Sequence, residues 1–250
     1  RRLKMQPIGD HQPHVGSFRR VDHFLTFTLG EGHRLFAGHV GARPGGPPSH
    51  PTRARVFAAA AREFAAHGFS GVSVDRIAAV AGLNKAMIYY HFTSKAALYR
   101  EVLREMFQAV GARVAEVASA TAAPADKIRQ VIDVFAAEAE AHPHFPPIWF
   151  REIAEGGAHL DETILRDMAV VVKSHTDILD EGVKTRRFTP VSPLLIHAGI
   201  VAPVLLFFAS AGIRKRIERV GVRGVSQINR DEVVEHVQRV TLGLLEGRIA

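Results

Sequence analysis

The sequence predicts an all-α protein. Apolar residues recur at spacings of three and four through most of the chain after residue 52, which is the period of one helix face. Residues that favour helix ends bracket these segments, whereas no alternating strand pattern and no internal repeat is found. Because 47% of the 250 residues are hydrophobic, the chain can bury a sizeable core.

The first 51 residues lack this period. They hold six of the fourteen His residues and end in GARPGGPPSHP, which cannot sustain a helix or a strand. The apolar run at residues 24–29 is too short and too mixed for the core of a signal peptide, so we expect no export. We expect disorder in residues 1–51, either as a basic arm that adds DNA affinity or as sequence translated from upstream of the true start.

The next fifty residues predict three short helices. The first is expected in TRARVFAAAAREFAAHGF, whose apolar residues share one face and whose helix Gly68 can end. Ser73 can cap the second helix, and Gly82 can end it in a tight turn. The third begins near Asn84 and turns Ile88 inward. Two short helices joined by a tight turn predict a helix-turn-helix, although an ordinary αα-hairpin has the same outline.

The third helix, about residues 84–90, is the candidate reader of a DNA major groove. We expect Lys85 and Met87 to contact base edges, Met87 through apolar contact because a thioether cannot donate a hydrogen bond. Further residues of the same segment are expected to hold phosphates, together with the amides that follow Ser73. These phosphate contacts are Ser73, Tyr89, Tyr90, His91 and Lys95.

The positive charge of the chain is unevenly distributed. Residues 1–49 and residues 50–105 each carry a formal charge of +4, whereas residues 106–250 carry −1. A generally basic surface would have spread this charge evenly. The excess over the predicted helix-turn-helix and the arm before it favours a nucleic-acid partner.

The remaining sequence predicts six further helices. Pro124 and Pro193 stand at positions where proline opens a helix, and Gly182 is expected to end one. Residues 194–213 form a run without charge, long enough to span a membrane. His197 and Pro203 within the run favour instead a helix buried between its own domain and a partner subunit. The six helices are expected at about residues 94–118, 124–141, 146–155, 161–181, 194–213 and 231–246.

No pattern of an enzyme active site is present in the sequence. There is no Gly-rich phosphate loop, no GxSxG and no HExxH, and the absence of cysteine excludes disulfides and thiolate metal sites. His142 and His144 flank Pro143 and are expected to be solvated rather than to bind a metal. Glu152 and Glu155 are expected on the solvated side of their short helix. We therefore expect neither catalysis nor a cofactor.

A pattern that spans about fifty residues of this segment strongly resembles the tetracycline-repressor (TetR) family of bacterial regulators. One departure is Met87, where the family usually has Ser or Thr early in the recognition helix. The resemblance implies a DNA-binding head over residues 52–98 and a helical effector-binding and dimerisation domain over residues 99–250, whose last two helices form a four-helix interface with a second subunit. The resemblance rests on Phe64, Gly68-Phe69, Ser73-Val74, Ile77-Ala78, Ala81-Gly82-Leu83, Ile88-Tyr89-Tyr90-His91-Phe92 and Lys95-Ala96-Ala97-Leu98.

The resemblance also implies an effector pocket between the connecting helix and the later helices. An apolar pocket with few charges suits a hydrophobic or aromatic small molecule. Each candidate can equally be core, and His175 can be a hydrogen-bonded core histidine. The candidate pocket residues are Phe107, Val110, Trp149, Phe150, Met168, His175 and Phe207.

These observations predict a cytoplasmic, homodimeric transcriptional regulator, most simply a repressor that a small hydrophobic effector releases from a double-stranded DNA operator. No membrane partner is expected. Two alternatives stay open: a helical small-molecule-binding protein or enzyme that does not bind DNA, and a regulator anchored in a membrane through residues 194–213.

Overall fold

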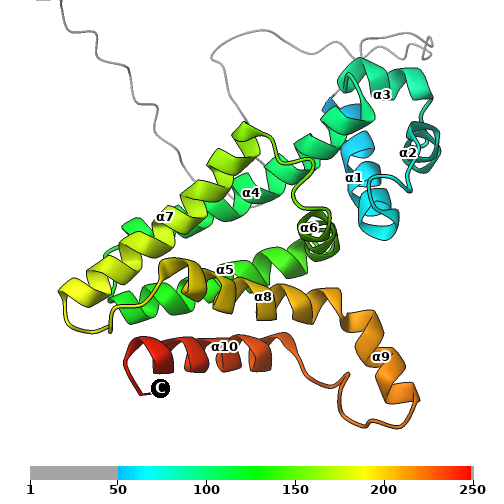
Figure 1. Ribbon diagram of the computed structural model, residues 1–250. Coiled ribbons are helices and arrows are strands. Elements are labelled where there is room, and N and C mark those ends of the chain that lie inside the picture. Colours follow the sequence, from blue (N-terminus) through cyan, green and yellow to red (C-terminus); the bar gives the residue numbers. More distant parts are fainter. Residues whose placement is uncertain (1–49, 249–250) are drawn as a thin grey trace, which may run out of the picture. The chain divides into compact units, whose positions relative to one another are not determined.

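All regular structure in residues 50–248, the part of the chain that the structure describes, is helical (Figure 1). This computed structural model confirms the predicted all-α class and has ten helices and no strand in that part of the chain. Their bounds are α1 (His50–His67), α2 (Val74–Ala81), α3 (Lys85–His91), α4 (Lys95–Ser119), α5 (Pro124–Ala141), α6 (Phe145–Ala154), α7 (Glu162–Lys184), α8 (Pro193–Ala209), α9 (Ala211–Arg219) and α10 (Arg230–Leu245).

The helix-turn-helix forms at the residues that predicted it. The Ser73 hydroxyl accepts a hydrogen bond from the Arg76 amide at 3.1 Å and caps α2. Gly82 ends α2 in the left-handed region, with a φ of 63°. Asn84 caps α3 by accepting from the Met87 amide at 3.0 Å. The turn between α2 and α3 is therefore specified locally by two caps and one glycine.

The first three helices share a core with the start of α4. Phe64 of α1, Ile77 of α2, Ile88 of α3 and Leu98 of α4 are all fully buried. Tyr99 meets the Phe64 ring edge to face, with centroids 4.8 Å apart. Because α4 continues to Ser119, the expected domain boundary between residues 98 and 99 falls inside one helix.

The later helices are arranged around α4 and α5. The helices α4 and α7 pack along much of their lengths, while α5 contacts α4, α7, α8 and α10. In Figure 1, α10 lies beside α8, and α6 lies next to α1. The helix α6 thus connects the first three helices with the helices of the later part.

The apolar run at residues 194–213 is not one helix. It breaks at Ser210 into α8 and α9, which are bent by 57° relative to one another. The Ser210 hydroxyl donates to the Leu206 carbonyl at 2.6 Å, and Arg214 donates to the Phe207 carbonyl, so side chains hold the end of α8. In residues 50–248, no single helix has the length and hydropathy of a membrane span; by length and composition alone, the bent α8–α9 pair could form one.

The expectation that Gly182 ends a helix was wrong, because α7 continues to Lys184. The glycine serves a close approach instead: a side chain at position 182 would collide with the Phe188 ring, which is buried there. The next residue, Thr189, donates its amide to the Leu245 carbonyl at 2.7 Å. The end of α7 is thus fastened to the end of α10.

The expectations for residues 1–51 lie outside the described residues, apart from His50 and Pro51. These two residues already belong to α1, so that helix begins slightly earlier than the sequence predicted.

Candidate DNA interface and ligand cavity

The helix α3 is held to its neighbours by one buried side chain and presents the rest. Ile88 is fully buried, whereas Lys85 is exposed and Tyr89 and Tyr90 are 46% and 68% exposed. Met87 is half-buried at the edge of this surface. The structure therefore brings the expected base-contacting and phosphate-contacting residues of α3 together on one accessible helix.

The polar side chains of α3 differ in their surroundings. Lys85 donates to Asp75 of α2, with 2.9 Å between Nζ and Oδ2, and this hydrogen bond raises the pKa of Lys85. His91 is half-buried and meets the Tyr90 ring edge to face at 5.3 Å. The Nε2 atom of His91 is buried and has no hydrogen-bond partner among the described residues. Because the ion pair with Asp75 is exposed and weak, Lys85 can exchange Asp75 for another anion.

Lys95 has internal partners that its expected phosphate contact would have to displace. Its ammonium donates to the carbonyls of Phe69 and Val72, both at 3.0 Å, and lies 4.2 Å from the centre of the Phe69 ring. A cation that already satisfies two carbonyls fixes the turn between α1 and α2, and it must leave those carbonyls before it can hold a phosphate. Ser73 remains exposed, as a phosphate contact requires.

A small cavity of about 50 Å³ lies between α4, α5, α6, α7 and α8. Four of the expected pocket residues line it: Phe107, Val110, Trp149 and Met168. The only ionisable side chain among the lining residues is His197 of α8. The lining residues that the sequence did not single out are Phe135, Phe145, Val171, Val172, His197 and Val201.

Three expected pocket residues do not line the cavity. Phe207 lies under the Arg214 guanidinium at the end of α8, 4.0 Å from ring centre to cation. Phe150 is half-buried and packs against the core, and His175 is fully buried behind the cavity wall. Helical periodicity shows which faces are apolar, but it does not show which buried residues border a gap.

The size of the cavity limits what it can hold as it stands. A volume near 50 Å³ admits a water molecule, whereas sites for drug-sized molecules typically measure about 300–1,000 Å³. A larger ligand must therefore push the surrounding helices apart. Because five helices form the wall, entry of such a ligand changes the spacing between them.

Comparison with known proteins places this arrangement in a family. A family model described as "Bacterial regulatory proteins, tetR family" matches residues 56–102, which include all of α2 and α3. Residues 56–102 therefore match the TetR family. The transcriptional repressor SCO4008 of Streptomyces coelicolor is 36% identical over 106 residues, which is 42% of this chain and 52% of that protein. The chain thus matches about half the length of this relative.

Two further members match over more of their length. The transcriptional regulator RutR of Escherichia coli is 24% identical over 193 residues, 77% of this chain and 88% of that protein. The solved structure of the ketosteroid transcriptional regulator KstR2 of Mycobacterium tuberculosis has a TM-score of 0.61 at 20% identity and covers 80% of this chain and 97% of that one. The structural likeness confirms the TetR fold of a helix-turn-helix head and a helical C-terminal part.

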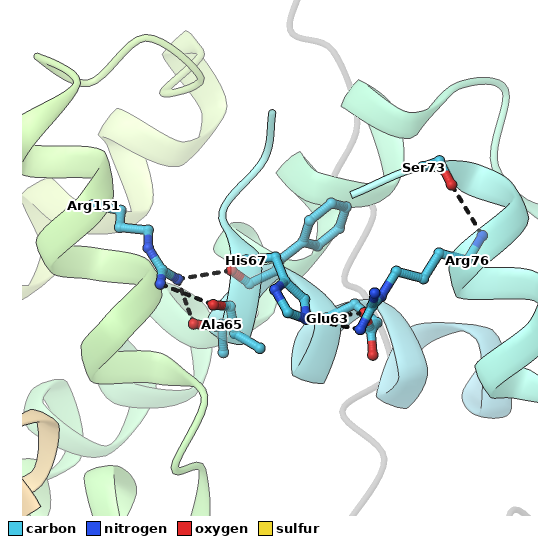
Figure 2. A network of polar contacts seen from close by, with 8 residues as sticks. Glu63, Ala65, His67, Ser73, Arg76 and Arg151 are labelled. Atoms are coloured by element: carbon cyan, nitrogen blue, oxygen red, sulfur yellow. Dashed lines mark hydrogen bonds and ion pairs between the residues drawn. The ribbon is translucent and has the colours of Figure 1, made fainter. Parts of the chain in front are cut away.

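Outside the segment that matches the family model, Arg151 joins α6 to the end of α1 (Figure 2). Its guanidinium donates to the carbonyls of Phe64 and Ala66, at 3.0 and 3.1 Å, and to the carbonyl of Ala65. These carbonyls lie in the last turn of α1, where a cation is favourable to the helix dipole. The only sequence signal for this contact is an arginine, followed by Glu152, in an otherwise apolar α6.

The other side of α1 is bound to α2. Arg76, in the first turn of α2, forms an ion pair with Glu63 of α1, and its Nη2 lies 2.8 Å from Nε2 of His67 (Figure 2). The cavity-lining helix α6, the first helix α1 and the helix-turn-helix are thus joined in series by arginine side chains.

The expectation that Glu152 is solvated was wrong. Its side chain is fully buried and accepts hydrogen bonds from the Tyr99 hydroxyl at 3.1 Å and from the His159 amide at 2.7 Å. Burial, and then the Glu152 charge, raise the pKa of Tyr99, so the phenol keeps the proton that it donates. The mistake arose because α6 turns this face towards α1 and α4, which sequence spacing does not reveal.

Glu152, Glu155 and His159 also form a group that could hold a metal ion, with ligand atoms within 4.8 Å of one another. Both Glu152 oxygens, however, already accept hydrogen bonds: Oε1 from the His159 amide, and Oε2 from Tyr99, with the His159 ring nitrogen Nδ1 3.1 Å away. The arrangement is that of a hydrogen-bonded junction between α4, α6 and the segment before α7.

Proposed function

We propose that this protein is a homodimeric transcriptional repressor that binds operator DNA through α3 and releases it when a small hydrophobic molecule enters the cavity. The observation that carries the proposal is the exposure of α3: Ile88 anchors the helix, while Lys85, Tyr89 and Tyr90 face outward. Together with the match of residues 56–102 to the TetR family, this surface suits insertion into a major groove.

The roles on α3 follow from chemistry. Lys85 can donate to a guanine edge, and Met87 can contact a thymine methyl. The hydroxyls of Tyr89, Tyr90 and Ser73 can donate to phosphates, which set position without reading sequence. We propose these roles together with His91, and we assign Lys95 to the internal turn that its hydrogen bonds hold.

The proposed dimer contact lies on α8 and α10. These helices pack side by side, and each keeps large apolar side chains exposed. Such a surface is typical of an interface between subunits. A two-fold dimer would present α3 twice, to half-sites about 34 Å or a small multiple of it apart. The exposed apolar residues are Leu194, Leu195 and Leu206 on α8 and Val240 and Leu244 on α10.

The proposed effector is a hydrophobic small molecule. The cavity wall is apolar apart from His197, and the relative KstR2 is described as a ketosteroid regulator. Entry of a ligand would move α6, which contributes Phe145 and Trp149 to the wall. Because Arg151 of α6 holds the end of α1, that movement would change the orientation of the head.

The proposal is tested with fluorescently labelled duplexes from the DNA that flanks the protein's own gene and with scrambled duplexes of equal length. We expect binding that prefers one flanking sequence and weakens steeply with salt. Replacing Lys85 by Ala should lower affinity for the preferred duplex by about 1–3 kcal/mol.

The matched control is Lys173→Ala on α7. Both lysines are exposed and paired with an aspartate, Lys85 with Asp75 and Lys173 with Asp177. The control removes the same charge away from α3 and should leave sequence preference intact. Absence of salt-dependent duplex binding, or equal effects of the two substitutions, would overturn the proposed function and favour a small-molecule-binding protein.

A further inference from the structure

Two histidines lie together at one side of the cavity, the half-buried His197 and the fully buried His175. The ring of His197, which lines the cavity, meets the ring of His175 edge to face with centroids 5.0 Å apart. Both rings also pack near Phe135, another lining residue, at 6.1 and 6.2 Å. His197 is therefore the polar residue of an otherwise apolar cavity wall, and His175 lies directly behind it.

Each ring has a buried nitrogen without a hydrogen-bond partner among the described residues: Nε2 of His175 and Nδ1 of His197. A buried polar atom that lacks a partner costs about 1–3 kcal/mol, so two such atoms on touching rings require an explanation. His175 is fully buried, so bulk water cannot provide the missing hydrogen bond to its Nε2.

The hydrogen-bonding capacity of His175 is set by its other nitrogen. Nδ1 lies 2.8 Å from the Val171 carbonyl, which can only accept, so Nδ1 carries the proton. In the neutral ring, Nε2 is then an acceptor. Burial lowers the pKa of His175, and burial together with the neighbouring His175 lowers the pKa of His197 to about 4, so both rings are neutral at pH 7.

The residues that line the cavity also determine which ligand charge is suitable. No aspartate, glutamate, lysine or arginine lines the cavity, so a charged ligand would lose its hydration without gaining a counter-ion. A neutral hydroxyl has one donor and two acceptor lone pairs. When a ligand pushes the surrounding helices apart, its hydroxyl can accept from a protonated Nδ1 of His197 on the wall and donate to Nε2 of His175 behind it.

We propose that His175 and His197 determine effector specificity by selecting a neutral, largely apolar molecule that carries a hydroxyl group, an alcohol or a phenol. This inference rests on the proposed function in taking the cavity as the effector site. It adds the polar group that the effector must carry and the two side chains that recognise it.

The test compares probes that differ only by hydroxyl and methyl: 4-ethylphenol with 4-ethyltoluene, and 2-naphthol with 2-methylnaphthalene. Dissociation constants are measured calorimetrically on the full-length protein without DNA. We expect the hydroxyl member of at least one pair to bind about tenfold or more tightly than its methyl twin, as one well-made hydrogen bond to a buried acceptor provides.

The variants His175→Phe and His197→Phe should reduce that ratio to about one. The matched control His236→Phe replaces an exposed histidine of α10 and should keep the wild-type ratio. No preference for hydroxyl in either pair, or a preference that survives both cavity substitutions, would overturn the proposal.

A second measurement needs no variant. In histidine-labelled protein, nitrogen NMR should show His175 protonated on Nδ1 and His197 protonated on Nδ1, with both ring signals shifting when 2-naphthol binds. If the two rings instead hydrogen-bond a resident water that 2-naphthol does not displace, their signals will stay unchanged and the proposal fails. Operator binding by the ligand-free protein is measured separately. If the hydroxyl preference is absent but operator binding is present, the specificity proposal fails and the proposed DNA-binding function stands. If operator binding is absent, the proposed function fails independently of the hydroxyl test.

Discussion

Two polar clusters in this molecule have similar aromatic surroundings but differ in whether their buried polar atoms have hydrogen-bond partners. Around Glu152, the rings of Tyr99 and His159 meet edge to face at 4.8 Å, and both carboxylate oxygens accept hydrogen bonds. Around His175 and His197, the rings meet edge to face at 5.0 Å, yet each keeps one buried nitrogen without a partner among the described residues.

The difference corresponds to the positions of the two clusters. The Glu152 cluster lies beside Arg151, where α6 contacts α1, and a fully satisfied network there holds one arrangement of head and later helices. The histidine pair lies at the cavity, where an unsatisfied group leaves free energy for a ligand to recover. A buried polar group thus fixes geometry in one region and can select a ligand in the other.

The largest effect should come from breaking the satisfied cluster. Glu152→Ala leaves the Tyr99 hydroxyl and the His159 amide without their acceptor and should lower the free energy of unfolding by about 3–5 kcal/mol, measured by urea denaturation at fixed protein concentration. The neighbouring Glu155→Ala, which removes an exposed carboxylate, should cost less than about 1 kcal/mol. Equal losses would show that the Glu152 network is not what stabilises this junction.

The contact next to this cluster should affect DNA binding. Arg151→Ala removes the donor to three carbonyls at the end of α1, so the head should sample more orientations and operator affinity should fall by about 1.5–3 kcal/mol, measured by fluorescence anisotropy. Arg151→Lys should recover only part of this, because an ammonium lacks the planar fork. The exposed Arg166→Ala on α7 serves as the control and should bind operator like the wild type.

The unsatisfied cluster should show itself in the pH dependence of stability. His197 has a pKa of about 4 in the folded protein against an ordinary value of 6.5, so the unfolded chain binds a proton first as the pH falls. Its neutral form favours folding above pH 6.5, and this stability is lost as the pH falls towards 4. Between pH 7.5 and 5, the wild type should lose about 1–2 kcal/mol more than His197→Phe in parallel urea titrations. Parallel curves would contradict the shifted pKa.

The smallest effect on stability should come from removing the unpaired nitrogen of His175. His175→Phe removes a buried nitrogen that has no partner but also the hydrogen bond to Val171, so the free energy of unfolding at pH 7.5 should change by less than about 1 kcal/mol in either direction. The difference between this small change and the large loss expected for Glu152→Ala tests the comparison of the two clusters most directly. A loss as large as that of Glu152→Ala would mean that His175 stabilises the core as Glu152 does.

Much of the head could be predicted from the sequence because its determinants are local. Caps at Ser73 and Asn84, a left-handed glycine at 82 and the inward-facing Ile88 lie within one short segment, and the structure has each where the pattern predicted it. An amphipathic period identifies the buried face of a helix, so the exposed face of α3 follows from it.

The remainder depended on contacts between distant segments. Glu152 was expected in water because its own helix gives no sign that Tyr99, 53 residues earlier, donates to it. Lys95 was expected to hold a phosphate, because its own segment gives no sign of the two carbonyls, 26 and 23 residues away, to which it donates. His197 was read only as an interruption in an apolar run, since its place on the cavity wall depends on four other helices.

The close contact between Gly182 and the Phe188 ring has a consequence for the proposed dimer. With Phe188 filling the space of a missing side chain and Thr189 tied to Leu245, the last turn of α10 takes its position from the end of α7. Even a methyl group at 182 would displace the ring, release that tie and let the tail of α10 fray. Gly182, which lies outside the exposed apolar surface of α8 and α10, would thereby affect the proposed dimer contact there.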